Sequence, residues 1–428
     1  MSSAESAVAV PSARRVARVA GPLMYSTVAA MASQVVVLAL LGRLHDESLY
    51  VRSAYTPVAF VFIAVSSALT VTLQVLVARA VGARRQGDIP ALTGAVLRVG
   101  VTVYGVACLG VLAGGGWLAG AFGVEEAVRE EFSRFLAVMT LVTALGFASE
   151  VVASVLRGVG ATLAGAGLLT GNIVLGMGVV AVLAPVIGLA ALPVTLAVAS
   201  AIELAVGVVL LRRRGLFTRA SVTGRVPVLG DVLRIGVPVG ISALVLFVVN
   251  LAFLRIVAPH GQAAVAGFTF ANTLHTVLIM PAIGFGSGMA IVMNHHPGAE
   301  LAIYRRGLAL AAGGYALLTV LIVVAGVPVI RLLIDNPNAV DFMRITGPTA
   351  GATGMILVAM TVLEHTGNGI AALMMNAQFF GFLILAAVVF SGSVRGLCWT
   401  LAIGSTFGAV TGLPIAGHLL RRRLKGAT

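Results

Sequence analysis

The stretch "AVASAIELAVGVVLLRRR", residues 197–214, decides the fold class of this chain. Its only charged residue before the three terminal arginines is Glu203. Comparable apolar runs of about 20 residues recur along the sequence, each long enough to cross a hydrocarbon core of roughly 30 Å. Of the 428 residues, 59% are hydrophobic and only 10% are charged, whereas a soluble domain needs more charge on its surface. The sequence therefore predicts an all-α membrane protein with many spans.

The basic residues indicate topology rather than a nucleic-acid partner. The net charge is +13, and the basic residues lie in short breaks between apolar runs, among them Arg14, Arg15, Arg18, Arg84, Arg85, Arg212, Arg213, Arg214, Arg305, Arg306, Arg421, Arg422 and Arg423. Alternate breaks are acidic, as in "LHDES" and "GVEEAVREEF". By the positive-inside rule, the basic breaks are cytoplasmic. We expect a multi-pass protein of the cell (plasma) membrane with both termini in the cytoplasm, whose first apolar run is a membrane helix rather than a signal peptide.

Cutting the sequence at its charged and turn-rich breaks predicts about twelve transmembrane helices. Their expected centres lie near residues 30, 67, 105, 145, 175, 201, 244, 279, 318, 353, 381 and 408. The longest connection falls near the middle of the chain. The predicted organisation is a cytoplasmic N-terminal tail (1–16), an N-lobe of helices 1–6 (17–215), a cytoplasmic linker (216–230), a C-lobe of helices 7–12 (231–422) and a cytoplasmic C-terminal tail (423–428).

Short matches between the two halves indicate an internal repeat. "RVAGP" at residues 18–22 matches "RIGVP" at residues 234–238, an offset of 234 − 18 = 216. "SVLRGVGA" at residues 154–161 aligns with "TVLEHTGN" at residues 361–368, an offset of 361 − 154 = 207. With six helices in each copy, both copies have the same orientation in the membrane. Two pseudo-symmetric six-helix lobes around a central cavity suit alternating access.

Several motifs resemble one transporter family. They are "VAGP" and "ALLGRL" in the first apolar run, "QVLVARAVGARRQGD" in the second, "VLRGVGATLAGAGLLTGNIVLGMG", "VLRIGVPVGI" and "MPAIGFGSGMAIVMNHHPGAE". In order and spacing the chain resembles multidrug and toxic compound extrusion (MATE) transporters, part of the wider multidrug/oligosaccharidyl-lipid/polysaccharide flippase superfamily. The resemblance implies antiport, driven by H⁺ or less readily by Na⁺, that exports small organic compounds such as drugs or secondary metabolites. It implies no cofactor beyond the coupling ion. We expect a monomer whose partners are its substrate and the lipid bilayer, with no nucleic acid.

Two acids inside the apolar runs are candidates for proton coupling. Glu203 lies nine residues before Arg212, about 13 Å from the cytoplasmic edge at 1.5 Å per residue. Glu150 lies seven residues before Arg157, about 10 Å from the same edge and on nearly the same helix face. Ionisable residues at such depth mark ion or substrate paths. The alternative is that an Arg or a hydroxyl partners each carboxylate and that the pair serves packing.

The chain departs from the resemblance at the family's usual acidic positions, where it carries Val37, Gly176, Leu246 and Thr353. Glu150 and Glu203 are therefore candidates to replace the family's usual coupling acids at other positions. His275, deep in the eighth run, is a third candidate because histidine titrates near neutral pH. A neutral histidine bonded to a carbonyl oxygen is the alternative.

Buried amides are the candidate substrate-binding residues: Gln34, Asn172, Asn250 and Asn376. Such residues also hydrogen-bond neighbouring helices, which is the alternative. "GFGSG" at residues 284–288 is not a phosphate loop, because it lies within an apolar helix rather than after a strand. Together Pro281, Gly284 and Gly288 predict a kinked or thinned helix that serves gating.

Other functions are less well supported by the sequence. His295 and His296 lack a ligand partner at metal spacing, so we expect no metal site. No catalytic grouping or nucleotide-binding motif is present, and we expect no enzyme. A flippase for a lipid-linked precursor would line its cavity with several cations, yet few arginines lie deep in the runs. A non-transporting membrane scaffold is the remaining alternative, distinguished by the absence of substrate flux.

Overall fold

The computed structural model describes residues 11–41, 46–121, 124–223, 226–334, 336–390 and 392–426, and these are helical without a strand. The long helices of the first half are α1 (Ala13–Leu41), α2 (Asp46–Gly82), α3 (Ile89–Ala121), α4 (Arg129–Gly158), α5 (Thr162–Ile187) and α6 (Ala191–Arg213). The second half contains α9 (Val237–Val257), α10 (Gln262–Ile279), α11 (Pro281–His295), α12 (Glu300–Leu333), α13 (Pro337–Ile345), α14 (Ala350–His365), α15 (Gly369–Phe390) and α16 (Val394–Gly426). The short helices α7 (Ala220–Thr223) and α8 (Leu229–Asp231) and the π-helical turn η4 (Val232–Gly236) lie between the two sets.

These helices confirm the predicted fold class. Among the described residues, 10 helical stretches are long and apolar enough to cross a membrane, and one of them, Thr162–Arg213, contains both α5 and α6. Helix α1 adds a further 29 residues. Helices α10 and α11 share one stretch, as do α13 and α14. Every predicted helix centre lies within one of the observed helices.

The helix predicted around residue 279 is interrupted. Helix α10 ends at Ile279, and α11 begins at Pro281. Because proline has no backbone N–H, it is tolerated in the first turn of a helix but breaks a helix interior. The interruption therefore falls at the position where the sequence places Pro281, while a role of this residue in gating remains a prediction.

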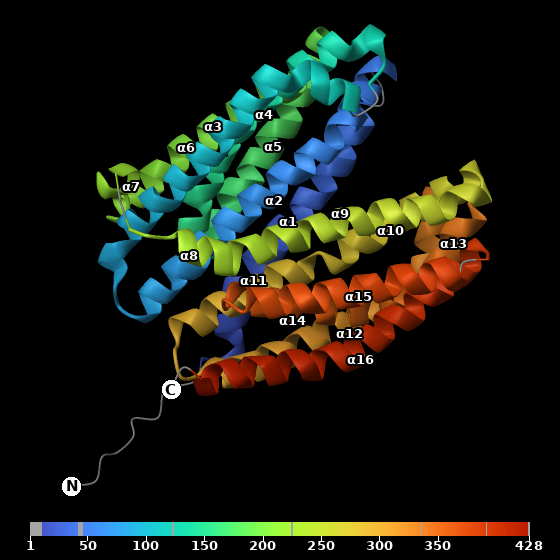
Figure 1. The fold of residues 1–428 in the computed structure, drawn as a ribbon. Helices are drawn as coiled ribbons and strands as arrows, with labels where there is room; N and C mark the ends of the chain where they lie inside the picture. The colour runs from blue at the N-terminus through green and yellow to red at the C-terminus, as the bar shows by residue number, and fades with distance from the viewer. Residues whose placement is uncertain are drawn as a thin grey trace. The chain divides into compact units, whose positions relative to one another are not determined.

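The chain forms two compact units, and each is described by itself. One contains Met1–Val28 and Leu244–Thr428, and the other contains Ala29–Ala243. The first part of α1 is thus grouped with the second half of the chain, and the first part of α9 with the first half (Figure 1). The predicted lobe boundaries, 17–215 and 231–422, remain a prediction.

The same helix crossing occurs in both units. In one unit, a methyl group added to Gly288 of α11 would lie 2.5 Å from the Cα of Ala20 in α1. In the other, a methyl group added to Gly236 would lie 2.7 Å from the Oγ1 of Thr72 in α2. These pairs are related by the sequence offset, because 20 + 216 = 236 and 288 − 216 = 72. Small residues let membrane helices approach closely without a hydrophobic driving force. The repeat seen in the sequence is therefore also present in the contacts.

The turn after α4 repeats in the turn after α14. Gly160 has φ 84° and Gly367 has φ 88°, a backbone conformation that favours glycine. The N–H of Gly160 donates to the carbonyl of Arg157, and the N–H of Gly367 donates to that of Glu364. All four positions follow the offset of 207. This register allows α4 and α5 to be compared residue by residue with α14 and α15.

Candidate functional site

The Glu203 side chain is enclosed by helices α4, α5 and α6. Only 6% of Glu203 is exposed. Its Oε2 accepts hydrogen bonds from the Ser149 hydroxyl of α4 at 3.0 Å and from the Asn172 amide of α5 at 2.6 Å. Its Oε1 is buried and has no hydrogen-bond partner among the described residues. The carboxyl group therefore has two donors on one oxygen and none on the other.

Close packing of α4 against α6 positions this carboxyl group. One turn after Glu203, Gly207 faces Val152 of α4, and a methyl group added to Gly207 would lie 2.5 Å from the Val152 Cγ1. One turn before Ser149 on the same face, Gly146 lies beside Ser200, with 3.5 Å between an added methyl group and the Ser200 Oγ. Small residues on both helices thus bring the Ser149 hydroxyl within reach of Glu203.

Glu150 and Arg157 form an ion pair on α4. The Arg157 guanidinium donates to the Glu150 carboxylate and, over 2.8 Å, to the Ser154 hydroxyl. The side chains of Arg157 and Glu150 are 13% and 28% exposed. The Arg157 stem passes close to α5, where a methyl group added to Gly165 would lie 2.9 Å from the Arg157 Cγ. The Nε of Arg157 is buried without a hydrogen-bond partner in the described chain.

The structure brings together three of the residues predicted from the sequence: Glu203, Asn172 and, next to Ser149, Glu150. Their roles in coupling and substrate binding remain predictions. Sequence reasoning did not select Ser149 or Ser154. Ser154 lies on the face of α4 that carries Glu150 and Arg157, whereas Ser149 lies on another face and its spacing gave no signal. Chemically, a buried carboxyl group with one unpartnered oxygen can take up and release a proton.

Apart from Gln34, the other predicted site residues belong to the compact unit that contains Leu244–Thr428. Asn250 of α9 accepts a hydrogen bond from Asn272 of α10 at 3.2 Å and donates to the Leu246 carbonyl, so it bridges two helices. The side chain of Gln34 lies outside the described residues, although its backbone belongs to α1. Asn250 therefore has the helix-bridging contact of the packing alternative, and a role in substrate binding remains a prediction.

Two of these residues are deeply buried. His275 of α10 is 6% exposed and meets the Phe342 ring edge-on, with 5.9 Å between ring centroids. Its Nε2 has no hydrogen-bond partner among the described residues. Asn376 of α15 is 5% exposed, and its Oδ1 is likewise without a partner there. A coupling role for His275 and a substrate-binding role for Asn376 remain predictions.

The glycines predicted to serve gating lie at helix crossings. Gly284 and Gly288 face α1, where an added methyl group would lie 2.6 Å from the Leu23 backbone or 2.5 Å from that of Ala20. Gly286, between them, faces Val358 and Thr361 of α14. Helix α11 is thus packed closely on two sides. This gives the glycines a packing function, and their role in gating remains a prediction.

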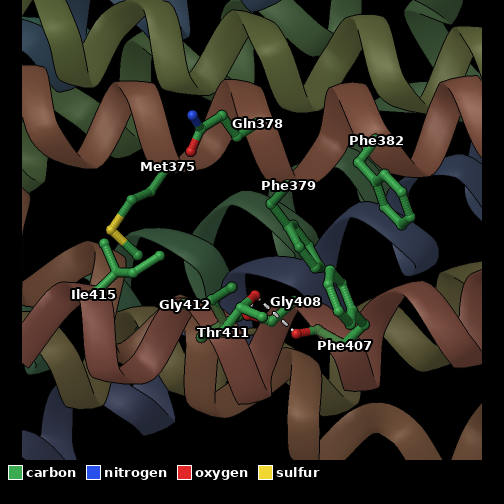
Figure 2. A pocket seen from close by; sticks show the side chains of 10 residues that line it. Met375, Gln378, Phe379, Phe382, Phe407, Gly408, Thr411, Gly412 and Ile415 are labelled. Atoms are coloured by element: carbon green, nitrogen blue, oxygen red, sulfur yellow. Dashed lines mark hydrogen bonds between the residues drawn. The ribbon is translucent and has the colours of Figure 1, made fainter.

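A groove that the sequence did not predict lies between α15 and α16. It has a volume of about 240 Å³, and its floor includes Ile356 of α14. Aromatic side chains, including Phe379 and Phe407, line it together with Gly408 (Figure 2). The hydroxyl of Thr411 donates to the Phe407 carbonyl at 2.9 Å. The lining is uncharged.

The sequence and the fold are both similar to those of known transport proteins. A sequence profile of the MatE family matches residues 22–182 and 238–391. The fold is similar to a mutant of the Vibrio cholerae MATE transporter VcmN, with a TM-score of 0.88, 18% identity, and coverage of 96% of this chain and 97% of that chain. It is also similar to a MATE in complex with MaD5, with a TM-score of 0.89, 17% identity and coverage of 97% of both chains.

A further solved structure with this fold is a MOP superfamily transporter from Pyrococcus furiosus, with a TM-score of 0.86, 16% identity, and coverage of 98% of this chain and 97% of that chain. No curated protein matches the chain in sequence.

The long apolar helices and the match to the family profile identify a multi-pass membrane transport protein. Because the family profile covers most of the chain, the protein belongs to the MatE family. This confirms the resemblance drawn from the sequence motifs.

Proposed function

We propose that this protein is a secondary active exporter of the plasma membrane that exchanges protons for small organic compounds such as drugs or secondary metabolites. Its two repeats would expose the substrate site to each side of the membrane in turn, with both termini in the cytoplasm. The substrate would cross the membrane chemically unchanged, and the ion gradient would drive its transport. Sodium is the less favoured coupling ion.

The single observation that carries proton coupling is the environment of Glu203. This carboxyl group belongs to an apolar membrane helix and is buried between that helix and its neighbours. One of its oxygens has no hydrogen-bond partner among the described residues. Asn172 and Ser149 donate to the other oxygen. Burying a charged carboxylate in such surroundings is costly unless it is fully paired. A site that supplies two donors but no cation at hydrogen-bond distance supports exchange between the ionised and the protonated form.

The environment also favours a proton over a sodium ion. Sodium is coordinated by several oxygen atoms. Among the described residues, the groups at hydrogen-bond distance from the Glu203 carboxylate are the Asn172 amide N–H and the Ser149 hydroxyl. The same hydroxyl also bonds the Gly146 carbonyl. The proposed coupling ion is therefore H⁺.

Glu203→Gln tests this function. The change keeps the size of the side chain and its contacts with Asn172 and Ser149 but removes the titration. In everted membrane vesicles loaded with a pH-sensitive dye, a panel of organic cations, anions and neutral compounds is added under an imposed pH gradient. We expect the wild type to release protons from the vesicle lumen in exchange for substrate that enters it, and E203Q to lose at least nine-tenths of this signal.

The matched control is Glu130→Gln, which makes the same change at an exposed acid of α4 whose side chain is 89% exposed. It should transport like the wild type. Proton-coupled transport that continues in a well-folded E203Q protein contradicts the assignment of Glu203. Transport that follows an imposed sodium gradient instead contradicts the choice of ion.

A further inference from the structure

The Glu150–Arg157 ion pair lies on α4, the helix whose Ser149 hydroxyl is hydrogen-bonded to Glu203. The charges that act on Glu203 come from Glu150 and Arg157, both on α4. The neighbouring helix α5 contributes the Asn172 amide and has no ionisable residue between Thr162 and Ile187. Ser149, which bonds Glu203, directly precedes Glu150 in the chain. The Glu150–Arg157 ion pair is thus the immediate electrostatic neighbour of the proposed coupling group.

Other cations at the same ends of the helices packed against α4 have different surroundings. The charges that act on Arg79 of α2 are those of Asp231 and Arg234. Arg98 of α3 lines a pocket with residues 226–229 of the connection between the repeats. These arginines are therefore directed to the linker region, which leaves Arg157 as the counter-ion available to the carboxylates of α4 and α6.

Arg157 has an unused hydrogen-bond donor, and its side chain has room to move. Its Nε is buried and has no hydrogen-bond partner in the described chain, and the Oε1 of Glu203 is in the same condition. Its stem lies over Gly165, so no β-carbon of α5 restricts it at that point. An unpartnered buried donor and an unpartnered buried acceptor are each unfavourable, and bringing them together removes both costs.

We propose that Arg157 is a shared counter-ion, held by Glu150 while Glu203 carries a proton and drawn toward Glu203 when that proton leaves. Glu150 and Arg157 then act as positioning residues that set the pH at which Glu203 gives up its proton. Glu150 competes for the guanidinium and so favours the protonated form of Glu203. This inference rests on the proposed function of Glu203 as the coupling group.

The sign of the expected effects follows from charge alone. Removing the Arg157 charge leaves an ionised Glu203 without a counter-ion, so its protonated form persists to higher pH. Removing the Glu150 charge leaves Arg157 entirely to Glu203, so the protonated form is lost at lower pH. The two single variants therefore shift the titration in opposite directions. An ion pair whose charges do not act on Glu203 would shift neither midpoint.

Infrared spectroscopy of the full-length protein in lipid nanodiscs measures this directly. The carbonyl stretch of protonated Glu203 is identified as the band that E203Q removes, and its amplitude is followed against pH. We expect the midpoint to rise by about one pH unit in R157Q and to fall by about one pH unit in E150Q. R157K, which retains the charge, should return the midpoint most of the way to the wild-type value.

The outcomes separate this inference from the proposed function. If R157Q and E150Q shift the midpoint in the same direction, or neither shifts it while E203Q still abolishes transport, the shared counter-ion is contradicted and the coupling role of Glu203 stands. If E203Q removes no titrating band and transport continues, the proposed function fails first. Should R157Q not fold, the E150Q midpoint decides: a fall shows that the Glu150 charge acts on Glu203 as the inference requires, and an unchanged midpoint contradicts the inference.

Discussion

The first repeat carries a polar cluster where the second carries an apolar groove. The offset of 207 that aligns the two turns relates Ser149 to Ile356 and Asn172 to Phe379 (149 + 207 = 356; 172 + 207 = 379). Opposite them, α6 presents Glu203, whereas α16 presents Gly408, whose missing side chain leaves room for the Phe379 ring. One backbone arrangement thus supports a carboxyl group with two donors in one repeat and aromatic packing in the other (Figure 2).

The fold does not by itself create the proposed coupling site. Three equivalent helices come together in each repeat: α4, α5 and α6 in the first, and α14, α15 and α16 in the second. At the positions compared, only the first repeat has the hydrogen-bond donors that a buried carboxylate needs. In the second repeat, the exchange of Ser and Asn for Ile and Phe removes every donor at those positions. The asymmetry supports a single coupling centre, located in the first repeat.

The largest expected effect comes from moving the carboxylate into the second repeat. Gly408→Glu would place an ionisable group against the Phe379 ring, in a groove with an uncharged lining. Without the donors that Ser149 and Asn172 provide in the first repeat, we expect a loss of about 3 kcal/mol or more in stability. Thermal unfolding of the purified protein in detergent measures it. Gly87→Glu, at a position with open space around an added β-carbon, is the control and should unfold like the wild type; equal stability of both variants would show that the groove tolerates a charge.

A smaller effect is expected from making the first repeat resemble the second. Asn172→Leu removes the 2.6 Å hydrogen bond to Glu203. A hydrogen bond to a charged group contributes about 1.5–3 kcal/mol. The ionised form of Glu203 should therefore be disfavoured by roughly ten- to hundredfold, and proton-coupled transport in everted vesicles should slow accordingly. The matched variant Phe379→Leu changes the equivalent position of the second repeat and should leave the coupling unaffected. Loss of coupling in both variants would contradict the assignment of the coupling centre to the first repeat alone.

The smallest effect is expected where the two repeats are alike. Gly288→Ala and Gly236→Ala each put a methyl group about 2.5 Å from backbone atoms of the crossing helix, either at Ala20 or at Ala68. Overpacking of this kind costs about 1–2 kcal/mol. We expect similar losses in thermal stability for the two variants. Gly105→Ala, in open space on α3, should be neutral or slightly stabilising. A large difference between the two crossings would show that the repeats diverge there as well.

Much of the fold was predictable because the bilayer restricts the solutions. Apolar runs of about 20 residues separated by basic and acidic breaks predict both the number of helices and their centres, since only helices satisfy their own backbone hydrogen bonds in lipid. The repeat was also readable, because "RVAGP" and "RIGVP" place a small residue, Ala20 or Gly236, at the same helix crossing. The interruption near Pro281 follows from the missing N–H of proline.

The candidate site was predictable only in part. Glu203, Glu150 and Asn172 stood out because ionisable and amide groups are rare in apolar runs. Ser149 and Ser154 did not, since serine is common in membrane helices and its partner cannot be inferred from spacing. The groove between α15 and α16 was not anticipated, because Phe, Met and Gly in an apolar run are equally compatible with packing or with an opening.

The amino-acid sequence was enough to predict a membrane protein of about twelve transmembrane helices in two related halves, because composition and charge fix which segments enter the bilayer. Only the tertiary structure decided that Glu203 lies against Ser149 and Asn172 while Glu150 lies against Arg157. Hydrogen bonds between helices depend on the rotation of each helix and on how closely glycines let them approach. Neither is encoded in the spacing of charged residues along a single helix.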